Sequence, residues 1–330
     1  MSTHSCDVVK IKLEEHPNAD SLSVVRVGGY QCVVKTEDWK DGDLGTYIPP
    51  DSLVPTSNPQ FAFLQKKDRS QERVKAIKLR GVWSQGLLIH APKGATEGQD
   101  LMKDLGIKHY EPPLSMSTGG DNEQAPPGHY PKYDVENFNR YNTVIQEGDE
   151  VVITEKIHGA NARYKWYNGR IYCGSRTNWK KEYEKSIWWR ALRQNPWIEE
   201  WCKTHPDFTL YGEVFGQVQN LKYGAGSNDI FFRVFDMWDG TKWLDYHEAM
   251  VYAKHKDYPG SHPRIKWVPV LYVGLFDENY ARELAEDNSS FSDAQHHREG
   301  IVIKPIHEKW DQELGRVILK IVGNKYLAKS

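Results

Sequence analysis

The sequence has few cysteines and no long apolar segment. Its four cysteines, Cys6, Cys32, Cys173 and Cys202, are scattered over 330 residues without a Cys-x-x-Cys pair. This spacing supports neither a zinc site nor a disulfide framework, and it predicts a reducing, cytoplasmic environment. No run of eighteen apolar residues occurs, and the first ten residues, MSTHSCDVVK, lack the apolar stretch of a secretory signal. We therefore expect no association with a membrane.

An excess of charge of one sign is also absent. The formal net charge is −2, so no global field attracts the chain to nucleic acid, and any such contact must come from local patches. The pattern GxxxxGK[ST] does not occur, which excludes a P-loop nucleotide site. The sequence contains 39% hydrophobic and 27% charged residues, which is typical of a globular protein. Its length of 330 residues suits two domains.

The chain changes character along its length. Residues 1–110 hold short β-branched segments separated by turn residues, which predicts a small all-β barrel. Residues 111–133 are rich in Pro, Gly and Ser and predict a linker. Residues 134–330 alternate strand and helix patterns, including an amphipathic helix over 180–195 that ends before Pro196. We expect an α+β domain there.

Charged residues stand at or beside the apolar runs of five predicted strands in this second domain. A single case is typical of a surface ion pair. Five cases in strands expected to share one sheet predict a polar cleft suited to a polyphosphate, a divalent metal and a nucleophilic amine. The residues are Lys156 in EKIHG, Arg176 in GSR, Glu213 in YGEVFG, Glu299 and Lys304 in REGIVIK, and Lys320 in ILKIV.

These motifs resemble, in order and spacing, the covalent nucleotidyltransferase superfamily of ATP-dependent polynucleotide ligases and mRNA-capping guanylyltransferases. KIHG is similar to the Lys-x-x-Gly nucleotidyl-lysine motif, and GSR, LYGEVFG, FFRVFD, EGIVIKP and LKIV are similar to the motifs that follow. KIHGAN is closer to RNA ligases than to DNA ligases. HPNADSLSVVRVGGYQCVV, GDLGTYIPP and AIKLRGVWSQGLLI resemble a tRNA-binding OB fold.

An OB module ahead of the transferase, with only ten residues after Lys320, resembles the nick-sealing RNA ligases of the Deinococcus and Naegleria type. The resemblance implies an α+β nucleotidyltransferase fold, ATP-grasp-like with antiparallel sheets and helices, preceded by an all-β OB-fold barrel. It implies an ATP-dependent RNA ligase that joins a 3′-hydroxyl to a 5′-phosphate at nicks, through lysyl-AMP and an AMP-capped 5′ end. The expected partner is nicked RNA or an RNA/DNA duplex, bound by a monomer.

Roles follow from the same resemblance. Lys156 would carry the nucleotide, Lys304 and Lys320 would hold the α-phosphate, and Arg176, whose planar fork suits phosphate oxygens, would hold the 5′-phosphate. Mg²⁺ or Mn²⁺ would bind at Glu213 and Glu299. Phe235 would stack on adenine, and Glu155 would read its amino group. The ATP contacts expected are Glu155, Lys156, His158, Asn161, Arg176, Glu213, Phe235, Glu299, Lys304 and Lys320.

Two positions depart from the family pattern. His158 stands where relatives have an aspartate, so a contact to phosphate or pyrophosphate, or a structural role, replaces a carboxylate contact to metal-bound water. The last motif has Ile318 and Val322 two residues either side of Lys320, where many relatives have a second lysine. Two alternatives stay open: a GTP-dependent capping-type guanylyltransferase and a non-catalytic nucleic-acid-binding protein.

Overall fold

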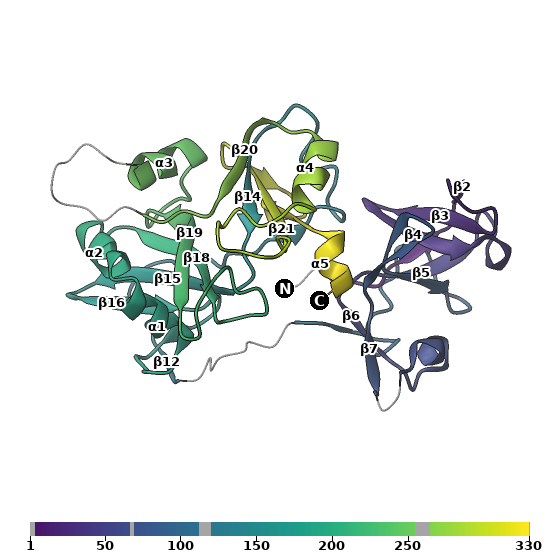
Figure 1. The fold of residues 1–330 in the computed structure, drawn as a ribbon, viewed down its shortest axis with the longest axis horizontal. Coiled ribbons are helices and arrows are strands. Elements are labelled where there is room, and N and C mark those ends of the chain that lie inside the picture. The colour runs from purple at the N-terminus through teal and green to yellow at the C-terminus, as the bar shows by residue number, and fades with distance from the viewer. Residues whose placement is uncertain (1–3, 67–68, 112–119, 255–264, 330) are drawn as a thin grey trace. The chain divides into compact units, whose positions relative to one another are not determined.

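The computed structural model describes residues 4–66, 69–111, 120–254 and 265–329 (Figure 1). The chain forms two compact units. The first comprises Met1–Pro112, Phe138–Asn142 and Asn324–Ser330, and the second comprises Pro113–Asn137 and Thr143–Gly323. In the described part of the chain, no helix has the length and apolar character that crossing a lipid bilayer requires. All four cysteines are free and buried.

The first unit is built from short antiparallel strands. Two clusters of buried side chains fill it, one around Ile48 and Phe61 and the other around Val25 and Trp39. Its sheets are β1 (Val8–Lys10), β5 (Leu44–Ile48) and β10 (Leu87–His90); β2 (Leu13–Glu15), β3 (Leu22–Val27) and β4 (Tyr30–Lys35); β11 (Lys108–His109), β6 (Ser52–Pro55) and β7 (Gln71–Arg73); and β8 (Ala76–Leu79) with β9 (Val82–Gln85). Short 3₁₀ turns, Thr36–Asp38 and Pro59–Leu64, and the C-terminal helix α5 (Asn324–Lys329) complete it.

The second unit contains two larger sheets. One has the order β12 (Asn122–Glu123), β17 (Trp179–Lys180), β16 (Arg170–Gly174), β15 (Ala160–Tyr167), β18 (Thr209–Gly216) and β19 (Ile230–Trp238). The other has the order β13 (Glu136–Asn137), β24 (Leu319–Val322), β21 (Gly300–Pro305), β14 (Glu150–Lys156) and β20 (Val270–Leu275). A separate hairpin pairs β22 (Trp310–Asp311) with β23 (Gly315–Arg316). All these pairs are antiparallel except β13 with β24.

This topology corrects the expectation that the charged strand ends share one sheet. Glu213 belongs to a strand of the six-stranded sheet, and Arg176 lies in the turn between two strands of that sheet, whereas Lys156, Lys304 and Lys320 belong to the five-stranded sheet. The alternation of apolar residues identifies the face that a strand buries, but it does not identify the neighbour with which the strand pairs.

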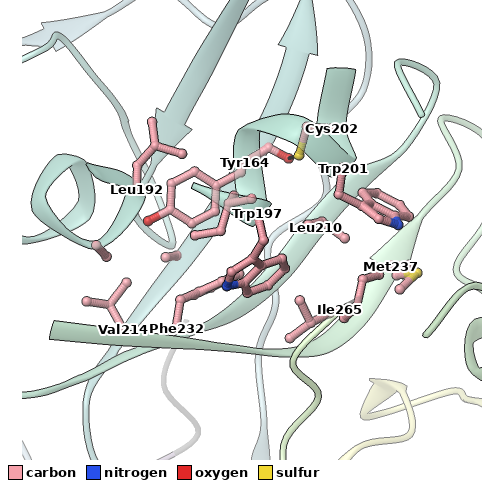
Figure 2. Close-up of a cluster of buried hydrophobic side chains, with 14 of the residues drawn as sticks. Tyr164, Leu192, Trp197, Trp201, Cys202, Leu210, Val214, Phe232, Met237 and Ile265 are labelled. Carbon is pink, nitrogen blue, oxygen red and sulfur yellow. Dashed lines mark hydrogen bonds between the residues drawn. The ribbon is translucent and has the colours of Figure 1, made fainter. Parts of the chain in front are cut away.

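Two helices pack against the six-stranded sheet. They are α1 (Ile187–Gln194) and α2 (Trp197–Thr204), and α3 (Tyr246–Lys254) contributes to the same apolar core. Figure 2 shows Trp197 of α2 beside Tyr164, with Phe232 below both of them, and Trp201 of the same helix farther along the cluster. The helix predicted over 180–195 is shorter than expected, because Trp179–Lys180 forms a strand between β12 and β16 and the helix begins at Ile187. A fourth helix, α4 (Glu278–Ala285), begins after the cap Asp277, whose side chain accepts from the N–H of Tyr280.

Contacts within the first unit also include segments that the predicted boundaries place in the second domain. The N–H of Gly29 donates to the carbonyl of Asn139 at 2.7 Å, and Nε2 of Gln85 donates to Asn324 at 2.8 Å. The predicted linker, 111–133, lies outside the described residues over 112–119. Its described part is not simply a tether, because β12 joins a sheet and Tyr133 is buried.

Candidate active site

Lys156 is the last residue of β14 and points into a pocket between the two sheets of the second unit. Its Nζ donates a hydrogen bond to Oε1 of Glu299 at 2.7 Å, and 23% of its side chain is exposed. Gly300, which follows Glu299, is the cross-strand partner of Lys156. The pairing of β14 with β21 therefore places this carboxylate beside the lysine.

The turn after Lys156 carries the chain from one sheet to the other. Gly159 is required there, because a Cβ at this position would lie 2.2 Å from the carbonyl oxygen of Val214. The N–H of His158 donates to the hydroxyl of Tyr223 at 2.6 Å. Tyr223 is buried and has a φ of +53°, an uncommon backbone conformation for a non-glycine residue. Tyr223 thus holds the turn that fixes where β14 ends.

Glu299 is surrounded by positive and polar groups. Nδ1 of His158 lies 3.3 Å from its Oε2, opposite the contact that Lys156 makes to Oε1. Burial alone would raise the pKa of Glu299, but the charge of Lys156, helped by His158, outweighs it and lowers that pKa to about 2. Glu299 is therefore ionised, and Lys156 is held as an ammonium ion in this arrangement.

A second carboxylate, Glu213 of β18, lies near the first. Burial raises the pKa of Glu213 to about 8; the charge of Glu299 adds to the increase, while Lys156 opposes it. Asn161 is the cross-strand partner of Glu213, and its Oδ1 is buried without a hydrogen-bond partner. Carboxylate and amide oxygens are the ligands that Mg²⁺ and Mn²⁺ prefer, so these residues fit a divalent cation.

Protein side chains alone do not complete such a metal site. In the described ranges, no cluster of three or more His, Cys, Asp or Glu side chains is arranged to hold a metal ion. A cation bound at Glu213 and Glu299 would take its remaining ligands from water or phosphate oxygens, as Mg²⁺ commonly does in phosphoryl-transfer sites.

The deeper walls of the pocket are apolar and aromatic. Phe235 lines it and packs against Tyr133, with ring centroids 4.4 Å apart. Val302 of β21 and Trp267 line the same pocket. Flat apolar walls beside a few polar groups suit a planar heterocycle. The pocket is lined by Tyr133, Val135, Val152, Thr154, Glu155, Lys156, Ile157, Asn161, Glu213, Phe235, Tyr246, Ala249, Trp267, Val268, Val302 and Lys304.

Lys304 reaches the pocket from within a buried network of charges. Its Nζ lies 2.9 Å from Oδ2 of Asp236 and 2.8 Å from Oε1 of Glu308. Arg316 binds the same two carboxylates and lies over the ring of Trp243 at 4.0 Å. Burial would raise the pKa of Asp236, but Arg316 and Lys304 hold it below its usual range. The sequence analysis assigned no role to Asp236, Glu308 or Arg316.

Two predicted site residues, Lys320 and Arg176, do not line the pocket, and a third, Glu155, lines it with its carboxylate bound to other groups. Lys320 does not line the pocket, yet it pairs across strands with Val302, so its side chain is on the pocket face of the sheet. Arg176, 55% exposed, is 3.2 Å from Asp134 and does not line the pocket. The carboxylate of Glu155 accepts hydrogen bonds from the Ser289 hydroxyl at 2.6 Å and the Ser290 N–H at 2.7 Å. An adenine contact by that carboxylate would have to share or replace these bonds.

Comparisons with known proteins agree with this architecture. A family model described as RNA ligase matches residues 149–322, and one described as an OB-fold domain matches residues 6–91. The first match contains every predicted site residue, from Glu155 to Lys320. Among curated proteins, no sequence matches the chain significantly.

Solved structures of a Naegleria gruberi RNA ligase are similar to the whole chain. A variant with ATP and Mn has a TM-score of 0.80 at 24% identity, covering 99% of this chain and 98% of that one. A variant with AMP and Mn has a TM-score of 0.79 at 23% identity, covering 99% of both chains. At this level of identity the likeness shows the fold. It confirms the predicted class, antiparallel sheets with helices preceded by an OB fold.

Proposed function

The chain belongs to the RNA ligase family, whose model matches more than half of it, and from this premise we propose that it seals nicks through a covalent lysyl-AMP. The proposed reaction joins a 3′-hydroxyl to a 5′-phosphate in nicked RNA or an RNA/DNA duplex, with a ribonucleotide at the 3′-hydroxyl side. The protein would act as a monomer, because one copy contains every residue that the reaction requires.

One observation carries the proposal: the amine of Lys156 lies at the junction of an aromatic pocket and two carboxylates, buried Glu299 and partly buried Glu213. Lys156 and Phe235 line the same pocket, and Glu299 is 2.7 Å from the lysine. A nucleotide with its base on Phe235 would place its phosphates toward Lys156. This arrangement is suited to nucleophilic attack at phosphorus.

ATP and Mg²⁺ or Mn²⁺ are the proposed cofactors. The similar Naegleria gruberi structures contain ATP or AMP together with Mn. In this chain Glu213, Glu299 and Asn161 supply oxygen atoms for a cation. A bound divalent cation would neutralise phosphate charge and polarise the phosphorus–oxygen bonds.

In the first step, the neutral amine of Lys156 attacks the α-phosphorus of ATP. A nitrogen–phosphorus bond forms, the bond to the pyrophosphate oxygen breaks, and the amine loses a proton. Lys320, on the pocket face of its sheet, would hold the α-phosphate. Lys304 would add positive charge from the pocket wall, although its ammonium already binds two carboxylates.

In the second step, a 5′-phosphate oxygen attacks the phosphorus of lysyl-AMP, and the lysine amine leaves. Arg176 is half exposed and could exchange Asp134 for that phosphate. In the third step, the 3′-hydroxyl attacks the activated 5′-phosphate, loses its proton and releases AMP. His158, buried beside Glu299, would position this carboxylate rather than bind phosphate directly.

Labelling with α-³²P-ATP and Mn²⁺ tests the proposal. We expect the label to stay on the denatured protein, to survive alkali and to be released by acid, as a phosphoramidate requires. Lys156→Ala should abolish labelling, whereas the control Lys181→Ala, at an exposed lysine, should retain it. Labelling by GTP alone would favour a capping-type guanylyltransferase. The absence of label with either nucleotide would favour a non-catalytic nucleic-acid-binding protein.

A nicked duplex then tests the joining reaction. We expect sealed product when the 3′-hydroxyl belongs to a ribonucleotide and the adjacent end carries a 5′-phosphate. Labelled protein that transfers no AMP to such a nick would contradict the nick-sealing role while leaving the covalent intermediate intact.

A further inference from the structure

Arg233 is an arginine of β19 that faces the same side of the sheet as the nucleotide pocket. Successive side chains of a strand alternate between faces, so Phe231, Arg233 and Phe235 share one face. Arg233 is also the cross-strand partner of Glu213. Two residues before the predicted base-stacking Phe235, the chain thus places a cation on the side of the sheet where the nucleotide would lie.

The guanidinium of Arg233 has no counter-ion among the residues that the structure describes. Within the described residues, its side chain forms no ion pair and no hydrogen bond, and its nearest aromatic contact is the ring of Phe291 at 5.6 Å. Burial lowers the pKa of Arg233 from its usual value. Arg316, by contrast, binds two carboxylates. A partly buried cation without a partner destabilises the fold, which points to a ligand outside the chain.

Lys266 lies next to Arg233. Val234 and Trp267 form a parallel bridge, so the residues that precede them are neighbours on adjacent segments. Arg233 and Lys266 line the same two hollows at the edge of the sheet. One hollow shares Tyr246 and Trp267 with the nucleotide pocket.

The other hollow is aromatic. Phe231 and Phe291 line it together with the two cations, and Asp293 is the carboxylate among its lining residues. Two cations beside aromatic rings are typical of surfaces that bind phosphates and stack bases.

We propose that Arg233 and Lys266 form a phosphate-binding position beside the nucleotide pocket. The planar guanidinium offers paired N–H donors to phosphate oxygens, and the lysine adds a mobile charge. The phosphate belongs either to the polyphosphate of ATP or to the backbone of the nucleic acid. This inference rests on the proposed ligase function and identifies two residues, Arg233 and Lys266, to which the sequence analysis assigned no role.

Arg233→Gln tests the site in two parallel assays, with Arg233→Lys as the charge-retaining variant. Arg170→Gln is the control, because Arg170 is paired with Glu123 at 2.8 Å and is 53% exposed. The first assay measures self-adenylylation against ATP concentration. The second measures binding of a nicked RNA duplex by unmodified protein between 50 and 200 mM KCl. The second assay reports on Arg233 even where labelling by ATP fails.

We expect Arg233→Gln to weaken one of the two interactions by about tenfold, as for a lost hydrogen bond to a charged group, with partial recovery in Arg233→Lys. A raised KM for ATP with unchanged nick binding assigns the site to the polyphosphate. Weaker nick binding, with the slope of log K against log salt reduced by about 1, assigns it to the backbone. The melting temperature of Arg233→Gln should not fall, because an unpaired charge is removed.

Two results would overturn the inference: Arg233→Gln that matches the parent protein in both assays, or a melting temperature lowered by several degrees, as for an arginine that supports the fold. Failure of the proposed function gives a different result, because the parent protein itself would then take no label from ATP.

Discussion

Replacing Glu213 by glutamine should stabilise the metal-free protein, and more so as the pH rises. Burial raises the pKa of Glu213 from near 4.5 to about 8, so the folded state keeps a proton that the unfolded state releases between these values. The folded protein therefore loses stability as the pH rises from 4.5 to 8. At pH 7 the loss is about 3 kcal/mol, from roughly 2.5 pH units at about 1.4 kcal/mol each. Glutamine has the same shape and carries no charge.

Urea unfolding in EDTA at pH 5, 6, 7 and 8 measures the effect. Tryptophan fluorescence reports mainly on the second unit, because ten of the twelve tryptophans lie there and only Trp39 and Trp83 lie in the first. We expect Glu213→Gln to exceed the parent protein by less than about 1 kcal/mol at pH 5 and by about 3 kcal/mol at pH 7. The control Glu182→Gln, at a 70% exposed glutamate, should show no such trend.

A difference between Glu213→Gln and the parent protein that stays constant from pH 5 to pH 8 would refute the reasoning. Added Mn²⁺ provides an independent check. A cation that binds the folded state alone stabilises it by mass action, so the parent protein should gain more from Mn²⁺ than the variant does.

Two further substitutions, one of them with a surface control, test the buried interactions of the second unit by urea unfolding. Asp236→Asn should lower the free energy of unfolding by about 3–5 kcal/mol, because it removes the fully buried one of the two carboxylates that Lys304 and Arg316 share; a loss below 1 kcal/mol would contradict the network. Trp201→Ala, at a 1% exposed core position, should cost about 3–5 kcal/mol, whereas Trp310→Ala, at a 67% exposed position, should stay within about 0.5 kcal/mol. Equal losses at the two tryptophans would show that the assigned core is wrong.

The sequence predicted the strands of the site well because each combines a strong local pattern with a charged residue at or near its end. Lys156 ends β14, Glu213 lies within β18, and Glu299 directly precedes β21. Such alternation depends only on neighbours in the chain, so it can be read without the fold. The pairing of strands depends on the whole chain, and the expectation of one shared sheet failed for that reason.

The buried network around Lys304 could not be predicted in the same way. Asp236 is 68 residues from Lys304 and 80 residues from Arg316. No local pattern in the sequence indicates that residues so far apart form ion pairs. Asp236 directly follows Phe235 within a recognised motif, which is the one hint that the sequence offers. Arg316 lies on a two-residue strand whose position is set by the hairpin with β22. Ion pairs between distant segments follow from tertiary packing.

Lys156 and Glu299 hold each other in a state that cannot begin the proposed reaction. The ammonium of Lys156 donates to Glu299 at 2.7 Å, and Glu299, with a pKa of about 2, does not accept its proton near neutral pH. Glu213, with a pKa of about 8, already holds a proton near neutral pH, so neither carboxylate takes the proton of Lys156 in the metal-free protein. A divalent cation at Glu299 would free the lysine from its partner and favour the neutral amine by its own charge. We therefore expect labelling of Lys156 to require the metal. Labelling in EDTA as fast as in Mn²⁺ would contradict this coupling.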